Sequence, residues 1–211
     1  MTVSPTGVVV PIRAFALGKA RLAEHLDPAE RAALGRRLAE QVVGAASGLE
    51  TLVVSSDEDV RSWAQGLHLS AIDDPGNLDA AAHEGRARLA HRGCTRIVIA
   101  HGDLPFATTF SGVARDGSRP VVVAVPCHRD DGTPVLSVPA DVDFAFAYGP
   151  GSFRRHAAEA RRLGMGFRVV RDRNLAFDVD LPDDLDQLTP GRGSRERSDQ
   201  SRRNAAEVRS P

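Results

Sequence analysis

Short apolar segments alternate along the chain with amphipathic segments rich in Ala, Arg and Leu. Several apolar segments have no polar position in their interior, as in the run from Ile97 to Ala100. Such runs predict strands that are covered on both faces, as in a parallel sheet. The expected strands are residues 7–12, 51–55, 68–72, 96–100, 120–125, 135–138 and 167–170.

Helices are expected between these strands. Asp27, Pro28 and Glu30 provide an N-cap, a first-turn proline and an early acid ahead of Leu34 and Leu38, which recur at helical spacing. Similar patterns predict helices at residues 57–65, 78–92 and 152–163.

The alternation of strands and helices predicts an α/β fold. We expect a single-domain three-layer α/β/α sandwich with a mostly parallel sheet, of the Rossmann-like kind. Residues 121–138 contain two strands separated by a short polar turn, and these are expected to form one β-hairpin insertion that interrupts the parallel pattern.

The composition excludes several classes of protein. The 211 residues carry 27 basic and 28 acidic side chains and a net charge of −1, so the body of the protein has no charge surplus to attract nucleic acid or a membrane. No segment approaches the roughly 20 apolar residues of a membrane span, and the N-terminus lacks the pattern of a signal peptide. We expect a cytoplasmic protein with no nucleic-acid or membrane partner, whose Cys94 and Cys127 are buried apolar residues.

The composition divides the chain near Thr189. Residues 1–188 have the length and periodicity of one domain. Residues 189–211 contain six arginines, three acids and no apolar periodicity, so we expect a disordered, arginine-rich C-terminal tail.

Cations gather after the first expected strand. In an open α/β sheet, ligands bind beyond the carboxyl ends of the strands, and here this loop holds Arg13, Lys19 and Arg21. Lys19 is the only lysine of the chain. Three such cations suit a triphosphate, although an ordinary solvated basic loop explains them equally well, and the P-loop pattern is absent.

Carboxylates occur at two further positions of this kind. Asp103 follows the most apolar strand, where it can hold Mg²⁺ or cap the next helix. Asp178 and Asp180 alternate in an extended segment and so face the same side, where like charges repel unless a cation lies between them. We therefore favour metal binding for this pair and expect Asp183 or Asp184 to cap the short helix that follows.

Two polar segments suit a second ligand. Thr133 ends a turn within the hairpin, and a glycine-rich loop containing Gly149 leads into a helix at Ser152. The backbone amides of a helix start, with the Ser152 hydroxyl, can bind an anion, although a turn with an N-cap serine is the alternative. His156 is either a ligand or an ordinary helix residue, and the other histidines receive no role.

Five motifs in this order resemble a known family, the phosphoenolpyruvate or 2-phospho-L-lactate guanylyltransferases of coenzyme F420 biosynthesis. The resemblance spans about residues 7–188 and extends to the molybdenum-cofactor guanylyltransferases and nucleotide-diphospho-sugar transferases. The motifs are P-x-R-x5-G-K-x-R-L from Pro11, G-D-L-P from Gly102, D-G-T from Asp131, Y-G-P-G-S-F-R-R-H from Tyr148 and D-V-D-L-P-D-D-L from Asp178.

The resemblance implies a reaction and a set of roles. The family transfers GMP from GTP to a phosphorylated three-carbon acid and releases pyrophosphate, and we expect phosphoenolpyruvate to be the acid used here. By resemblance, Mg²⁺ is held at Asp103, Asp178 and Asp180, and the acid is bound at Thr133, Gly149 and Ser152. We expect Lys19 and Arg21 on the triphosphate, with Arg13 assisting. Functional coupling to the downstream deazaflavin transferase is also implied.

Several alternatives remain open at this point. The acid could be 2-phospho-L-lactate or 3-phosphoglycerate. A sugar-phosphate or molybdopterin nucleotidyltransferase would carry a glycine-rich L-x-G-G-x-S-x-R-M-G loop, which residues 14–21 lack. A non-catalytic nucleotide-binding domain would bind GTP without needing all three aspartates.

Overall fold

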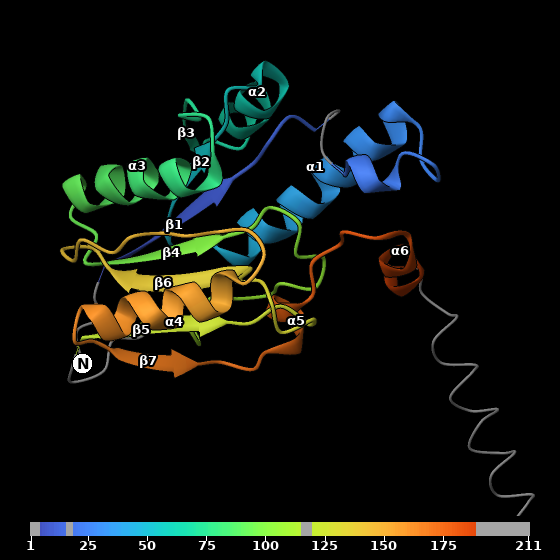
Figure 1. Ribbon diagram of the computed structural model, residues 1–211. Coiled ribbons are helices and arrows are strands. Elements are labelled where there is room, and N and C mark those ends of the chain that lie inside the picture. The colour runs from blue at the N-terminus through green and yellow to red at the C-terminus, as the bar shows by residue number, and fades with distance from the viewer. Residues whose placement is uncertain (1–4, 16–18, 115–119, 189–211) are drawn as a thin grey trace, which may run out of the picture.

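The apolar runs form one seven-stranded sheet in the computed structural model, which describes residues 5–15, 19–114 and 120–188 (Figure 1). The strands are β1 (Thr6–Pro11), β2 (Glu50–Val54), β3 (Ser70–Ile72), β4 (Arg96–Ala100), β5 (Val121–Val125), β6 (Val135–Pro139) and β7 (Gly166–Val169). The helices are α1 (Pro28–Ala45), α2 (Glu58–Gly66), α3 (Leu78–His91), α4 (Ser152–Arg162), α5 (Arg173–Ala176) and α6 (Pro182–Leu188), with a 3-10 helix at Ala20–Leu22. The order in the sheet is β3-β2-β1-β4-β6-β5-β7.

Helices cover both faces of the sheet, which confirms the expected three-layer α/β/α sandwich. Alternate residues of β1 point to opposite layers: Val8 and Val10 pack in the apolar cluster with α1 and α2, whereas Val9 packs in the cluster with α3 and α4. All three are fully buried. The run of apolar residues therefore reflects burial on two faces rather than on one.

The predicted hairpin is present, but it is built into the sheet. β5 and β6 pair antiparallel, with Val125 opposite Val135, and β6 also pairs antiparallel with β4, with Ala100 opposite Val135. The remaining neighbours, including β5 and β7, are parallel. Because β6 runs the other way, its beginning lies at the same edge of the sheet as the end of β4. Thr133 is thereby brought to the edge where His101 and Asp103 begin their loop.

The start of β3 differs from the expectation by two residues. α2 ends at Gly66, and the chain then turns through His68, whose φ of 57° lies in the left-handed region. The turn is closed by the amide of Leu69, which donates to the carbonyl of Ala64. Leu69 and its predecessor are therefore used to end the helix, and pairing begins at Ser70.

A glycine lets α3 lie close to the sheet. A Cβ atom on Gly85 would come within 2.4 Å of Val9 Cγ1, so this position has no room for a side chain. The close contact holds α3 against β1, and the beginning of α3 then reaches the carboxyl edge of the sheet. Gly85→Ala is expected to destabilise the fold by about 1–3 kcal/mol through overpacking, which urea unfolding would measure.

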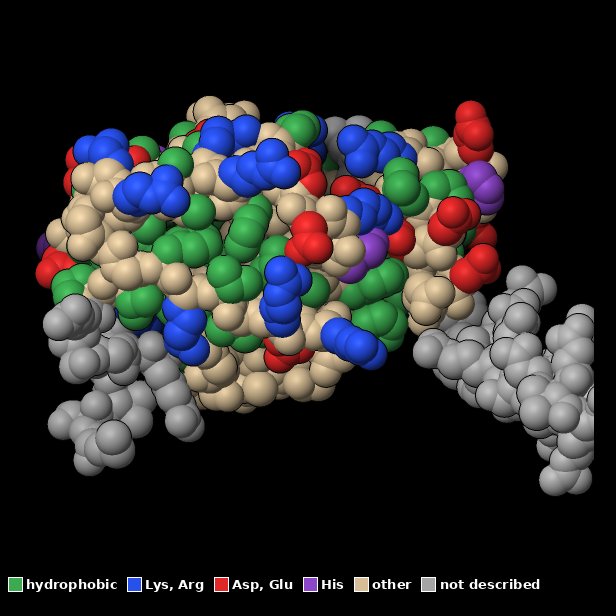
Figure 2. Space-filling model, turned by 60° about the horizontal axis from the view of Figure 1, so that its bottom comes forward, with side chains coloured by type: hydrophobic (Ala, Val, Ile, Leu, Met, Phe, Trp, Pro, Cys, Tyr) green, Lys and Arg blue, Asp and Glu red, His purple; other side chains and the backbone are tan. Residues whose placement is uncertain are grey.

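Other expectations concern the surface and the ends of the chain. Cys94 and Cys127 are free and buried, as predicted. The predicted tail, residues 189–211, lies outside the described residues. Among the helices that the structure describes, none is long and apolar enough to cross a membrane. On the face that includes the edge strand β7, basic side chains are spread among apolar and acidic ones rather than gathered in one patch (Figure 2).

Candidate active site

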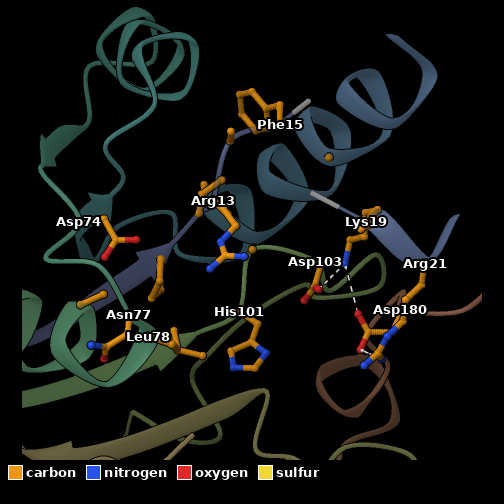
Figure 3. Close-up of a pocket in the computed structure, with 17 residues that line it drawn as sticks. Arg13, Phe15, Lys19, Arg21, Asp74, Asn77, Leu78, His101, Asp103 and Asp180 are labelled. Carbon is orange, nitrogen blue, oxygen red and sulfur yellow. Dashed lines mark hydrogen bonds and ion pairs between the residues drawn. The ribbon is translucent and has the colours of Figure 1, made fainter. Parts of the chain in front are cut away.

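A cleft of about 530 Å³ opens at the carboxyl edge of the sheet. Its walls come from the loop after β1, the 3-10 helix, the beginning of α3 and the loop after β4, as expected for an open α/β sheet. The polar and charged side chains on these walls are Arg13, Lys19, Arg21, Asp74, Asn77, His101, Asp103 and Asp180 (Figure 3).

Lys19 lies at the centre of the charged end of the cleft. Its backbone adopts φ 58° and ψ 38°, a left-handed conformation that is uncommon for a residue with a side chain. Its Nζ donates to the carboxylate of Asp103 and, at 2.6 Å, to the carbonyl oxygen of Val179, and lies 3.8 Å from Asp180 Oδ1. The Lys19 side chain is only 11% exposed, so the only lysine of the sequence is used as a nearly buried cation.

The alternation predicted for residues 178–180 is present in Val179 and Asp180, whereas Asp178 is not among the residues that line the cleft. Val179 is fully buried in an apolar cluster with Leu22, Leu34 and Leu38. Asp180 faces the cleft, where its Oδ2 lies 3.5 Å from Arg21 Nη1. The apolar residue between the two acids thus anchors the segment.

The carboxyl groups of Asp103 and Asp178 differ in the direction in which their surroundings shift the pKa. Burial alone raises the pKa of Asp103, but Lys19 and then His101 outweigh it and hold that pKa below its usual range. Asp178 shows the opposite balance, because burial and then the charges of Asp103 and Asp180 raise its pKa. For Asp103 the nearby cations thus outweigh burial, whereas for Asp178 they do not, although Arg129 Nη1 lies 3.9 Å and His128 Nδ1 3.3 Å from its Oδ1.

Two oxygens of this site fit a hard cation. Asp103 Oδ1 and Asp178 Oδ1 are buried, and neither has a hydrogen-bond partner within the described residues. Carboxylate oxygens are the ligands that Mg²⁺ prefers. No three His, Cys, Asp or Glu side chains of the described chain are grouped closely enough to hold a metal, and Lys19 Nζ lies between Asp103 and Asp180. The donor chemistry thus suits the ion, while the ligand set is not preassembled.

The two arginines of the first loop are more accessible. The Arg21 side chain is 71% exposed. Arg13 is exposed and extends into the cleft (Figure 3). Their positions suit contact with an anion that enters from solvent, and their role remains a prediction.

Asp184 is the last acidic residue of the motif that begins at Asp178, and its side chain has a structural role. Its Oδ2 accepts from the amides of Asp180 and Leu181 at 2.8 Å, and both of its carboxylate oxygens bond to Arg129 Nη2 at 2.9 and 3.0 Å. This confirms the expected cap at the start of α6. The capping bonds also hold the backbone of Asp180 beside the cleft.

Thr133 and Ser152 come together on the far side of His101. Their hydroxyl oxygens are 3.2 Å apart, and Thr133 Oγ1 is 3.1 Å from His156 Nδ1. The amide of Ala147 donates to His156 Nε2 at 3.1 Å, so Nδ1 carries the ring hydrogen and donates to Thr133. The Thr133 and Ser152 hydroxyls share a further hydrogen bond, in which either one can donate.

The predicted anion site at the start of α4 is largely occupied by the chain itself. The amide of Ser152 donates to the carbonyl of Gly149, and that of Phe153 donates to the carbonyl of Asp131. Thr133 and Ser152 are each only 1% exposed and do not line the cleft, whereas Gly149 lies on an exposed loop. Their role in binding the acid therefore remains a prediction that requires the loop to open or to use other amides.

His156 makes stability depend on pH. Burial, and then the charges of Arg155 and His101, lower the pKa of His156 from 6.5 to about 4. Between these values the unfolded chain binds a proton that the native state does not, so stability falls as pH falls through this window. The loss is expected to total about 3 kcal/mol.

Urea unfolding between pH 7.5 and 4 would measure this effect. His156→Gln keeps an acceptor for Ala147 and has no titratable group, so its stability should change about 3 kcal/mol less than that of the wild type over the same window. Equal pH slopes in the two proteins would show that His156 does not titrate in this way.

Sequence interpretation assigned no role to His101, although it immediately follows β4. The rule that ligands lie beyond strand ends applies to His101 as much as to Asp103, and this signal could have identified it. The beginning of α3 also belongs to the cleft: Asn77 lines it and caps the helix by accepting from the amide of Ala80. Asp79 accepts from the amide of Tyr148 at 2.6 Å and links α3 to the glycine-rich loop.

Solved structures define the class of this fold. A protein from Desulfovibrio desulfuricans, assigned provisionally as a nucleotide-diphospho-sugar transferase, superposes with a TM-score of 0.72 at 16% identity, covering 89% of this chain and 87% of that one. A nucleotidyl transferase from Methanothermobacter thermautotrophicus gives a TM-score of 0.63 at 18% identity, covering 87% and 95%. The fold is that of the nucleotidyltransferase-like α/β proteins.

Sequence comparison narrows this class. The model of the family described as guanylyl transferase CofC like matches residues 6–200. A phosphoenolpyruvate guanylyltransferase of Rubrobacter xylanophilus is 34% identical over 192 residues, covering 88% of this chain and 94% of the relative. A 2-phospho-L-lactate guanylyltransferase of Methanothermobacter thermautotrophicus is 29% identical over 191 residues, covering 87% and 83%. The chain belongs to the CofC-like guanylyl transferase family, and the resemblance noted in its motifs is confirmed.

Proposed function

We propose that this protein transfers GMP from GTP to phosphoenolpyruvate in coenzyme F420 biosynthesis. The observation that carries the proposal is the cleft in which Lys19 is held by Asp103 beside Arg13, because cations set against carboxylates at a strand edge suit a metal-bound triphosphate. The curated relatives that bear the name phosphoenolpyruvate guanylyltransferase support the choice of acid.

The chemistry follows from the two substrates. A phosphate oxygen of the acid attacks the α-phosphorus of GTP in line, the bond from that phosphorus to the bridging oxygen of the β-phosphate breaks, and pyrophosphate leaves with the bonding electrons. The product is enolpyruvoyl-2-diphospho-5′-guanosine. The attacking phosphate is already ionised near neutral pH, so no side chain has to remove a proton.

The side chains of the cleft serve to bind and orient the phosphates. Lys19 and Arg21, assisted by Arg13, would neutralise the triphosphate and the leaving pyrophosphate. Asp103, Asp178 and Asp180 would hold Mg²⁺, which supplies additional positive charge to phosphate oxygens when bound. Thr133, Gly149 and Ser152 would bind the acid.

The location and partners of the protein are part of the same proposal. The substrates are small anions, and we place the reaction in the cytoplasm without a nucleic-acid or membrane partner. The diphosphate product would pass to the downstream deazaflavin transferase, so the two enzymes would be functionally coupled.

Pyrophosphate release tests the reaction. The purified protein would be given Mg²⁺ and GTP with phosphoenolpyruvate, 2-phospho-L-lactate or 3-phosphoglycerate in separate assays, with the downstream transferase and its deazaflavin acceptor present to draw off the product. Release with phosphoenolpyruvate that Asp103→Asn abolishes is expected. Release with 2-phospho-L-lactate or 3-phosphoglycerate instead would identify that acid as the substrate. No pyrophosphate release with any of the three acids, although the protein binds GTP, would overturn the proposal.

A further inference from the structure

His101 carries a polar atom that the described chain leaves without a partner. Its Nε2 is buried and accepts or donates no hydrogen bond within the described residues. The hydroxyl of Tyr148 is in the same condition, and the two rings have centroids 5.5 Å apart. Buried polar atoms in proteins are nearly always hydrogen-bonded, and of these two residues His101 is the one that lines the cleft, so its Nε2 is placed to bond to a ligand bound there.

The position of His101 is determined by the sheet. It directly follows β4, and its amide donates to the carbonyl of Pro134 at 2.9 Å, one residue before the start of β6. The ring lines the cleft between Leu78 and Asp103 (Figure 3). This backbone bond fixes the main-chain position from which the imidazole extends into the cleft.

His101 separates the two regions assigned to the two substrates. On one side is the cleft with Lys19 and Arg13. On the other side, the ring of Tyr148 contacts both His101 and His156, with a centroid distance of 4.9 Å to His156. His156 in turn holds Thr133. A group at this boundary lies where the phosphate of one substrate has to approach the phosphate of the other.

We propose that His101 donates a hydrogen bond from Nε2 to a phosphate oxygen at this boundary, either on the nucleotide or on the acid. The inference rests on the proposed function, which places a phosphate on each side of the ring. His101 is then a further residue that contacts substrate, in addition to the cations of the loop after β1 and the three aspartates. Donation from Nε2 needs only the tautomer that carries its hydrogen there, so no change of charge is involved.

Three substitutions separate this contact from packing. In His101→Gln, the amide nitrogen reaches about as far from the backbone as Nε2 and can replace it as a donor. In His101→Asn, the amide nitrogen reaches only as far as Nδ1 and falls short. In His101→Phe, the ring that packs on Tyr148 is kept and the donor is lost.

Two readouts locate the phosphate. Calorimetric titration with GTP in the absence of acid reports contact with the nucleotide, and the KM for phosphoenolpyruvate in the pyrophosphate assay reports contact with the acid. In one of the two readouts, His101→Asn and His101→Phe are expected to raise the Kd for GTP or the KM for phosphoenolpyruvate by about 10- to 100-fold, the usual effect of losing one hydrogen bond to a charged group. His101→Gln should stay within a few-fold of wild type in both.

The ranking of the variants decides the inference. Weakening by Asn and Phe in the GTP titration assigns the contact to the nucleotide, and weakening confined to the KM assigns it to the acid. Equal values for Gln and Asn in both readouts, or a Phe variant as good as wild type, would overturn the inference. The same Gln and Asn substitutions at the exposed His91 on α3 serve as a matched control and should leave both readouts unchanged.

The outcome is separable from that of the proposed function. If the wild type binds GTP but transfers GMP to no tested acid, the proposed function fails while the GTP titrations of the His101 variants still decide the contact. If turnover is found but the three variants do not differ from wild type in either readout, the proposed function stands and the inference is wrong.

Discussion

Lys19→Met is expected to reduce pyrophosphate release by at least about 10²- to 10³-fold, because preorganised groups that stabilise transferring phosphates contribute on that scale. Lys19 is the nearly buried cation of the cleft and is held by Asp103 and the carbonyl of Val179. Arg21→Met is the matched control, since Arg21 is 71% exposed and lies 3.5 Å from Asp180. Its effect should be about tenfold or less.

The same substitution should also destabilise the protein. Without Lys19, the mostly buried Asp103 carboxylate loses its main counter-charge, and breaking such a pair costs about 3–5 kcal/mol. The lowered pKa of Asp103 means that the pair stabilises the native state above the usual carboxyl pKa and that this contribution is lost as pH falls through the folded value. The deficit of Lys19→Met in urea unfolding should therefore be present at pH 7 and shrink in strong acid.

A double variant isolates the structural role of Lys19. Lys19→Met combined with Asp103→Asn leaves no unpaired charge, so its stability in urea unfolding should recover toward that of the wild type. The catalytic role is read from the single variant, because Asp103→Asn alone is expected to abolish release. Turnover by Lys19→Met within tenfold of wild type would show that this cation does not act on the phosphates.

Asp178→Asn is expected to make the protein more stable and less active at pH 7. Burial and the neighbouring charges of Asp103 and Asp180 raise the pKa of Asp178, so its ionised form opposes folding, and a neutral isostere removes this cost. The expected gain is about 0.5–2 kcal/mol, the usual size for relieving strain at a functional site. As pH falls through the raised pKa, Asp178 becomes neutral in the wild type as well, and the gain should disappear.

Asp184→Asn is the matched control with the opposite sign. Burial raises the pKa of Asp184, but the amides of Asp180 and Leu181 and the Arg129 guanidinium outweigh it, so the net pKa is lowered. Loss of the Asp184 carboxylate charge should cost about 2–4 kcal/mol, because its bonds from Arg129 Nη2 and from the amides of Asp180 and Leu181 are weakened. If both variants destabilise equally in urea unfolding at pH 7, Asp178 is not held at an electrostatic cost.

Much of the site was accessible to sequence reasoning because it lies on short loops at strand ends. Lys19, Asp103 and Asp180 meet in one cleft because parallel strands end at the same edge of the sheet. His101 was missed because a histidine beside a strand has many ordinary roles. Its lack of a partner becomes visible only once neighbours from α3, β6 and the glycine-rich loop are in place.

The sequence by itself determined the layers of the fold. Apolar runs such as β4 can only be covered on both faces, and the alternation with amphipathic helices requires a sheet between helical layers. It also indicated a cap at Asp183 or Asp184, of which the structure uses Asp184, and the opposite facing of Val179, since both depend on local spacing.

Only the tertiary structure decided where β6 pairs and which polar groups are satisfied. Either strand of a hairpin can lie against β4 with the same local pattern, and the insertion of β6 between β4 and β5 is what brings Thr133 beside the loop of His101. Likewise, the pairing of Lys19 with Asp103 joins residues that are 84 positions apart. The Ser152 amide bonds to the carbonyl of Gly149 rather than to a ligand because of the fold of its own loop. Local propensity acts over a few residues, whereas charge pairing and desolvation depend on neighbours that the chain acquires only on folding.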